Sequence, residues 1–183
     1  MYDFHKSVVY QCYFKSFYDS NGDGVGDLRG VTAKLDYLQK LGVDYIWLNP
    51  FFPSPQRDNG YDVADYCAVD PRFGTMADFE ELSREAEKRG IRLMLDMVFN
   101  HTSTEHEWFQ KALAGDPDYE DYYIWREGGP DGTPPNNWES KFGGNAWQYV
   151  PEKGKWYLHL FDRTQADLNW ENPRVRKELQ NVI

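Results

Sequence analysis

The 183-residue sequence has little cysteine and no long apolar run. Its two cysteines, Cys12 and Cys67, are too few and too far apart for a disulfide framework or a zinc knuckle, so we interpret both as reduced thiols. No run approaches the roughly 18 apolar residues of a membrane span, and residues 1–10 lack the basic and apolar regions of a signal peptide. We therefore expect a cytoplasmic protein that does not bind membranes.

Basic residues are also scarce, because 20 Lys and Arg stand against 30 Asp and Glu, for a formal net charge of -10. The summed field repels phosphate backbones and anionic lipid, so we expect no nucleic-acid partner. Aromatic residues, by contrast, are abundant: 7 Trp, 13 Tyr and 11 Phe supply a capacity for burial that disordered chains lack. The composition predicts a globular protein.

The order of elements predicts parallel βαβ units. Strands are expected over residues 8–14, 45–48 and 91–99, with a helix between each pair, and such an order favours right-handed crossovers. Gly42 is placed to end the first helix, Thr75 and Asp78 to cap the second, and Gly90 to end it. The third strand is apolar at nearly every position, as in a parallel strand covered on both faces.

Regularity ends after Asn100. A short helical segment with Trp108, Phe109 and Leu113 leads into residues 115–157, which are rich in Gly, Pro, Asn, Trp and Tyr. A loop of that length inside a compact domain is usually a functional insertion. Asn172 and Pro173 then begin a new helix.

Residues 19–27 place oxygen-bearing side chains at every second position, with glycines that permit a tight wrap. Hard cations such as Ca²⁺ and Mg²⁺ require such ligands. The loop matches the first half of an EF-hand, but Gly30 occupies the twelfth position, where a bidentate Glu is needed, so the EF-hand interpretation fails. We predict ion binding by this loop; a turn without a metal is the alternative.

Polar residues follow the second strand, over residues 58–62, and lie at the end of the third, over residues 96–101. Taken alone, residues 58–62 are typical of a turn, and His101 is typical of a structural histidine. The carboxyl ends of parallel strands meet at one face, however, and Asp, Tyr and His side chains gathered there suit a polyhydroxylated substrate. The insertion adds rings that match the apolar faces of sugars or form a small core of their own: Trp138, Phe142, Trp147, Trp156, Tyr157 and Phe161.

Together, residues 19–27, 58–62, 96–101 and 165–170 resemble the α-amylase superfamily of glycoside hydrolases, and the resemblance covers essentially the whole chain. It implies an α/β fold, the N-terminal part of a (β/α)8 TIM barrel with about three βα units and an irregular inserted domain after strand 3. The implied domains are residues 1–100 for the barrel units, 101–171 for the inserted domain and 172–183 for the start of the return to the barrel.

The resemblance also implies the roles of individual residues. Asp58, Tyr61 and His101 would line the subsite that holds the transferred glucosyl ring, and Asp96 would support its floor. Further residues would wall the cleft from the inserted domain, namely Phe142, Phe161 and Gln165. The structural Ca²⁺ or Mg²⁺ would be held by Asp19, Asn21, Asp23, the carbonyl of Val25 and Asp27, and no organic cofactor is expected. Phe14 stands where the family usually has proline.

Members of this family cleave with retention, using a nucleophile and an acid whose carboxyls lie roughly 5–5.5 Å apart. The fourth-strand motif Gly-x-Arg-x-Asp and the fifth-strand glutamic acid do not occur here. We therefore assign no nucleophile or general acid within the chain, expect both beyond Ile183, and interpret the chain as an N-terminal fragment.

The expected substrate is an α-glucoside. Residues 54–56, 135–144 and 165–167 most resemble the enzymes that hydrolyse trehalose 6-phosphate to glucose and glucose 6-phosphate; oligo-1,6-glucosidase or other α-glucosidase activity is the alternative. A phosphorylated sugar requires a cation near the cleft, and Lys141 and Arg57 are candidates by charge, although solvated surface is the other interpretation. Hypotheses of another class are a non-catalytic relative and a free-standing sugar- or Ca²⁺-binding module.

Overall fold

The computed structural model describes residues 4–183, which form two compact units. The N-terminal unit holds the described residues up to Pro53 together with Ala68–Met97, and the C-terminal unit holds Ser54–Cys67 and Val98–Ile183. Residues 54–67, which the sequence places in a barrel connection, thus group with the inserted segment, as does the last helix. The predicted functional boundaries at residues 100 and 171 stay a prediction.

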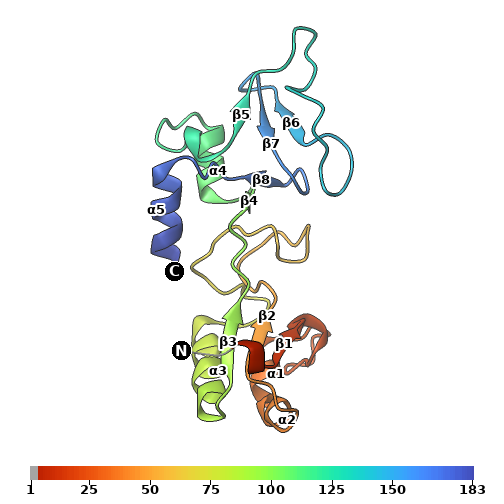
Figure 1. The fold of residues 1–183 in the computed structure, drawn as a ribbon, viewed down its shortest axis with the longest axis vertical. Coiled ribbons are helices and arrows are strands. Elements are labelled where there is room, and N and C mark those ends of the chain that lie inside the picture. The colour runs from red at the N-terminus through yellow and green to blue at the C-terminus, as the bar shows by residue number, and fades with distance from the viewer. Residues whose placement is uncertain (1–3) are drawn as a thin grey trace. The chain divides into compact units, whose positions relative to one another are not determined.

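A parallel three-stranded sheet forms the centre of the N-terminal unit (Figure 1). Its order is β1 (Val9–Cys12), β2 (Tyr45–Leu48) and β3 (Arg92–Leu95), with Val9 opposite Tyr45 and Tyr45 opposite Arg92. Helices α1 (Leu28–Ala33) and α2 (Leu35–Lys40) join the first two strands, and α3 (Met76–Lys88) joins the second pair. The predicted βαβ order and α/β class are confirmed.

The second crossover helix, α3, has the predicted ends. Thr75 Oγ1 accepts the Asp78 N–H at 3.3 Å, while an Asp78 oxygen accepts the Thr75 N–H at 2.7 Å, which is a capping box. Gly42 and Gly90 have φ of 82° and 73°, so both predicted helix ends carry a left-handed glycine.

Three expectations in this unit are wrong in detail. The first strand ends at Cys12, because Phe14 begins a 3₁₀ turn, η2 (Phe14–Ser16), and buries its ring 4.9 Å from that of Phe73. The expected single helix is two, separated at Lys34 with φ -105° and ψ 7°. Strand β3 ends at Leu95 and is partly exposed, because among the described strands it pairs only with β2.

The C-terminal unit contains more regular structure than the sequence predicts. Strands β4 (His101–Ser103) and β8 (Gln165–Asp167) form an antiparallel pair, and β5 (Trp125–Arg126), β7 (Lys155–Leu158) and β6 (Trp147–Val150) form a second antiparallel sheet. These strands have two to four residues, too few to show a period of two in the sequence. The inserted segment is therefore a small β-structure with long loops.

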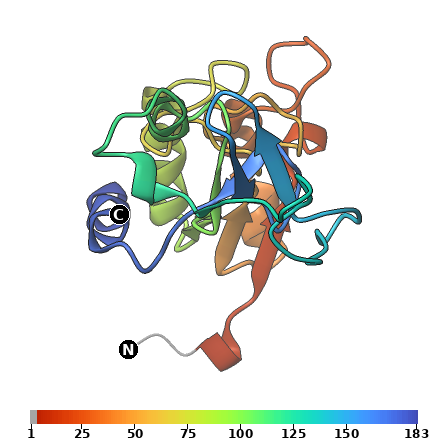
Figure 2. The ribbon, with the colours of Figure 1, turned by 90° about the horizontal axis from the view of Figure 1, so that it is seen from above.

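Three helical segments complete this unit: α4 (Glu107–Leu113), the 3₁₀ turn η3 (Glu120–Tyr122) and α5 (Pro173–Val182). Asn172 caps α5 by accepting the Arg174 N–H, as predicted, and Val175 and Leu179 are its buried positions. Helix α5 carries the C-terminal end of the chain (Figure 2). Another 3₁₀ turn, η1 (Phe4–Lys6), lies at the start of the N-terminal unit.

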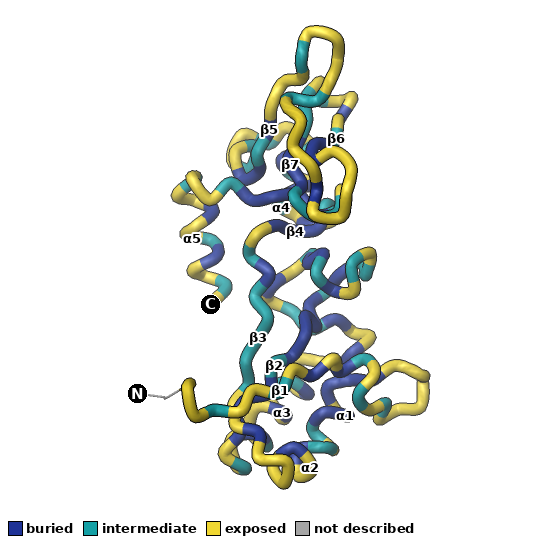
Figure 3. The backbone as a smooth tube through the Cα atoms, turned by 45° about the vertical axis from the view of Figure 1, so that its right-hand side comes forward, coloured by how far each residue is buried: buried dark blue, intermediate teal, exposed yellow. Residues whose placement is uncertain are grey.

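Aromatic rings form the core of the C-terminal unit. Phe109 contacts Tyr123, Trp125 and Tyr157 at centroid distances of 5.0, 5.9 and 5.1 Å. Trp147 is buried as well, which confirms that part of the insertion's rings form its own core. Trp138 and Phe142 are 53% and 61% exposed and lie on the mostly exposed loop that precedes β6 (Figure 3).

Both cysteines are free thiols, as predicted; Cys12 is buried, and burial raises its pKa to about 12. Across residues 4–183, no helix has the length and apolar character needed to cross a bilayer.

Candidate active site

The buried carboxylate of Asp62 organises the loop over residues 54–62 in the C-terminal unit. Its Oδ1 accepts the Ser54 hydroxyl at 2.8 Å and the Asp58 N–H at 3.2 Å, and its Oδ2 accepts the Arg57 N–H at 3.0 Å. Gln56 and Asn59 have φ of 63° and 51°, conformations that non-glycine residues rarely adopt. Asp62 therefore braces a loop with two left-handed residues, and this loop carries Asp58 and Tyr61.

The β4–β8 pair brings two more predicted residues to this loop. His101 and Gln165 are the first residues of the two strands, and Ser103 is the register partner of Gln165. The Gln165 amide donates to Asp58 Oδ2 at 2.8 Å and to the carbonyl oxygen of Tyr61 at 3.2 Å. Its own oxygen accepts the Asp162 N–H at 2.9 Å, which fixes the orientation of the amide. Thus residues 107 positions apart in sequence are joined directly.

The hydrogen bonds of His101 define its tautomer. Nε2 lies 2.9 Å from the carbonyl oxygen of Tyr61, which can only accept, so Nε2 carries the proton and donates it. Nδ1, 3.2 Å from the Asn100 amide nitrogen, is then the acceptor. Gln165 Nε2 lies 3.0 Å from His101 Nε2 because both nitrogens donate to the same carbonyl oxygen of Tyr61. Burial is the largest influence on the His101 pKa and lowers it, so the imidazole is neutral at neutral pH.

Asn100 links two residues that are register partners, His101 of β4 and Asp167 of β8. The buried Asp167 carboxylate accepts the Leu160 N–H at 2.9 Å and interacts with the Asn100 side chain. Burial raises the Asp167 pKa from its ordinary 3.8 to about 6, although both hydrogen bonds act in the opposite direction. Asp167 therefore supports His101 indirectly, through the side-chain amide of Asn100.

Two predicted wall residues lie next to the histidine. The Phe161 ring centroid is 5.2 Å from that of His101, and the Phe142 ring meets Phe161 edge-on at 5.9 Å. Ser140 anchors the wall by donating its hydroxyl to the Phe161 carbonyl at 2.7 Å. The structure thus brings together all six site residues predicted in this unit, which are Asp58, Tyr61, His101, Phe142, Phe161 and Gln165.

Asp96 and the predicted metal loop belong to the N-terminal unit. Asp96 Oδ2 accepts the Trp47 indole N–H at 3.3 Å. Its predicted part in the substrate floor stays a prediction.

Within the loop over residues 19–27, Asp19 accepts the N–H groups of Asn21, Gly22 and Gly24 at 3.1, 2.7 and 2.8 Å. The bonds from Gly24 and Gly22 lower the Asp19 pKa most, so its carboxylate is ionised at neutral pH. Asp27 instead caps α1 by accepting the Gly30 N–H at 2.6 Å, and its second oxygen accepts the Ser20 hydroxyl at 2.8 Å. Among residues 4–183, no three His, Cys, Asp or Glu side chains lie close enough together to hold a metal.

The assembled residues can bind a polyhydroxylated ring. Asp58 Oδ1 accepts no hydrogen bond from residues 4–183, so it remains for a ligand hydroxyl, and the Phe161 ring beside His101 supplies an apolar face. Three supporting residues escaped the sequence prediction of the site: Asp62, Asn100 and Asp167. All three stood within the segments singled out, but no pattern distinguishes a supporting carboxylate or amide from one that touches the ligand.

The chain is similar to several known proteins. The family model for the alpha amylase catalytic domain matches residues 11–183. The trehalose-6-phosphate hydrolase of Escherichia coli is 63% identical over 175 residues, which are 96% of this chain and 32% of that protein. The oligo-1,6-glucosidase of Parageobacillus thermoglucosidasius is 56% identical over 179 residues, or 97% of this chain and 32% of that protein.

Among solved structures, the trehalose-6-phosphate hydrolase of Bacillus licheniformis superposes with a TM-score of 0.94 at 58% identity. The match covers 97% of this chain and 32% of that one. The chain therefore spans about a third of the length of the relatives it matches.

Proposed function

The chain belongs to the alpha-amylase family, and from this premise we propose that it is the N-terminal portion of a retaining α-glucosidase that hydrolyses trehalose 6-phosphate to glucose and glucose 6-phosphate. The observation that carries the proposal is the joined set of Asp58, Gln165 and His101, with a neutral imidazole and an open carboxylate oxygen. The similarity to trehalose-6-phosphate hydrolases of two genera supports the choice of substrate.

In this proposal the chain binds and orients the glucosyl ring. Asp58 Oδ1 accepts a ring hydroxyl, the Nε2–H of His101 donates to another once Tyr61 releases it, and Tyr61 stacks beneath the ring. The nucleophile and the general acid belong to the remainder of the protein. A phosphorylated sugar does not cross a lipid bilayer unaided, so the proposed site of action is the cytoplasm.

The test is product analysis with the full-length protein. We expect equal amounts of glucose and glucose 6-phosphate from trehalose 6-phosphate, with isomaltose cleaved far more slowly. Rapid cleavage of isomaltose without release of glucose 6-phosphate would replace this proposal with oligo-1,6-glucosidase activity, which the second similarity supports.

We further propose that the loop over residues 19–27 binds Ca²⁺ or Mg²⁺. The donor set fits a hard cation, because Asp19, Asn21, Asp23 and the Val25 carbonyl offer only oxygens and a carboxylate oxygen has a second lone pair beside any hydrogen bond it accepts. The ion would neutralise carboxylates and brace the turn after β1, without touching substrate.

For the metal, we expect calorimetry of the chelator-treated full-length protein to detect Ca²⁺ or Mg²⁺ uptake that Asp19→Ala abolishes. Glu80→Ala is the matched control, since it removes one exposed carboxylate from α3 of the same unit. Absence of uptake by the wild-type protein, or undiminished uptake by the Asp19 variant, would refute this assignment.

A further inference from the structure

An anionic substrate needs a local cation on this protein. The chain has a formal net charge of -10, so its summed field opposes a sugar phosphate. A hydrogen-bonding ammonium or guanidinium beside the cleft overcomes that field at short range. Several cations of the C-terminal unit are already occupied. Lys111, Lys155 and Arg174 form ion pairs with Glu107, Glu120 and Asp118.

The two arginines nearest the site residues in sequence are unsuited to the task. Arg57 forms an ion pair with Glu105 at 3.1 Å. Arg57 and Arg163 both line an open cavity of about 780 Å³ between α4 and the β6–β7 turn, and none of the six site residues of this unit lines that cavity.

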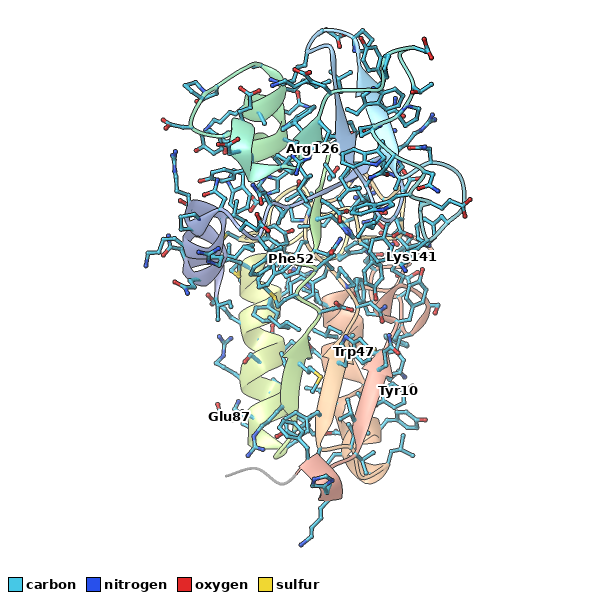
Figure 4. All side chains as sticks on the ribbon, turned by 45° about the horizontal axis from the view of Figure 1, so that its top comes forward. Tyr10, Trp47, Phe52, Glu87, Arg126 and Lys141 are labelled. Carbon is cyan, nitrogen blue, oxygen red and sulfur yellow. The ribbon has the colours of Figure 1, made fainter. Side chains whose placement is uncertain are left out.

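Lys141 differs from these arginines, because its segment is bonded to the wall of the site and its ammonium is not paired with any described residue. Its backbone N–H donates to the Leu160 carbonyl at 2.8 Å, so the segment from Ser140 to Phe142 is fastened to the chain that carries Phe161. Phe142, the next residue, contacts Phe161, which in turn contacts His101. Figure 4 shows Lys141 on this loop.

The charge of Lys141 is also uncompensated. The side chain is exposed, and its ammonium has neither an ion pair nor a hydrogen bond to any of residues 4–183. A lysine ammonium offers three donors on a flexible stem, which suits a phosphate as a point charge. If Asp58 and His101 hold the unphosphorylated glucosyl ring, the phosphate lies on the neighbouring ring of the disaccharide.

We propose that Lys141 binds the 6-phosphate of the substrate and sets the preference for phosphorylated over neutral α-glucosides. This inference rests on the proposed function and adds to it the residue that recognises the phosphate. Arg57, the other candidate by charge, is assigned no such role because it forms an ion pair with Glu105 and lines a cavity that includes none of the six site residues of this unit.

The experiment compares two substrates on the full-length protein: trehalose 6-phosphate, and p-nitrophenyl α-glucoside, which has the same transferred ring and no phosphate. We expect Lys141→Ala to lower kcat/KM for trehalose 6-phosphate by about 10- to 100-fold, mainly through KM, since a hydrogen bond to a charged group contributes on that order. Activity on p-nitrophenyl α-glucoside should stay within about twofold, and Lys141→Arg should recover most of the loss.

Lys177→Ala is the matched control, because Lys177 is another exposed lysine of this unit, on α5. The Lys177→Ala variant should have the wild-type kcat/KM for both substrates. Suppose that the wild-type protein cleaves trehalose 6-phosphate. If Lys141→Ala cleaves it equally well, or if its kcat/KM falls equally for both substrates, Lys141 is not the phosphate ligand. If the wild-type protein itself releases no glucose 6-phosphate, the proposed function fails and this assignment falls with it.

Discussion

Asp58→Asn in the full-length protein is expected to lower kcat/KM by about 100- to 1,000-fold, the loss typical when one preorganised group that stabilises a charged transition state is removed. Asparagine can still accept the Gln165 amide through its oxygen, so the loop keeps its shape. The negative charge beside the glucosyl ring is lost, and glycoside cleavage builds positive charge on that ring. Steady-state kinetics with p-nitrophenyl α-glucoside measure the effect without involving the phosphate.

Asp65→Asn is the matched control for this charge removal. Asp65 is exposed and accepts only the Cys67 N–H, at 2.8 Å, among the hydrogen bonds of the described residues. We expect its kcat/KM to be that of the wild-type protein. If Asp58→Asn retained full activity with an unchanged unfolding temperature, Asp58 would not be a substrate ligand.

The second large effect is expected from Asp62→Ala. This change leaves the buried Ser54 hydroxyl without its acceptor, together with the partly buried N–H groups of Arg57 and Asp58. A buried donor left unsatisfied costs about 1–3 kcal/mol, so the free energy of unfolding should fall by about that amount, with a smaller contribution from the two partly buried N–H groups. Activity should fall with it, because the strained backbone at Gln56 and Asn59 relaxes once its anchor is removed.

Denaturant unfolding of the full-length protein, beside Asp65→Ala as the control for losing an exposed acid, measures this loss. Asp62→Asn separates charge from hydrogen bonding, since an amide oxygen still accepts some of the three donors. An Asp62→Ala protein as stable and active as the wild type would show that the loop does not depend on this carboxylate.

Much of the N-terminal unit follows from local rules in the sequence. Thr75 and Asp78 form the predicted capping box, and Gly42 and Gly90 adopt the left-handed conformation that ends a helix. The break at Lys34 was not predictable, because Leu28, Val31, Leu35 and Leu38 keep an apolar helical spacing across it. Periodicity reports which face is buried and does not report whether the axis is continuous.

The site was predicted as a set of residues rather than as a geometry. Motif spacing and family resemblance identified Asp58, His101 and Gln165, yet the hydrogen bond between Asp58 and Gln165 joins positions 107 residues apart and depends on the β4–β8 pair. Those strands have three residues each, too short for a sequence period to reveal. Asp167 was missed for a related reason, since its raised pKa comes from burial, which is a property of the assembled unit.

A crystal structure of the full-length protein with bound glucose tests the central claim most directly, namely that this constellation holds the glucosyl ring. The account predicts sugar hydroxyls within about 3.2 Å of the Asp58 carboxylate and of His101 Nε2. It also predicts the ring face against Tyr61 and the Gln165 amide still bonded to Asp58. Glucose bound elsewhere, with Asp58 and His101 untouched, would contradict it.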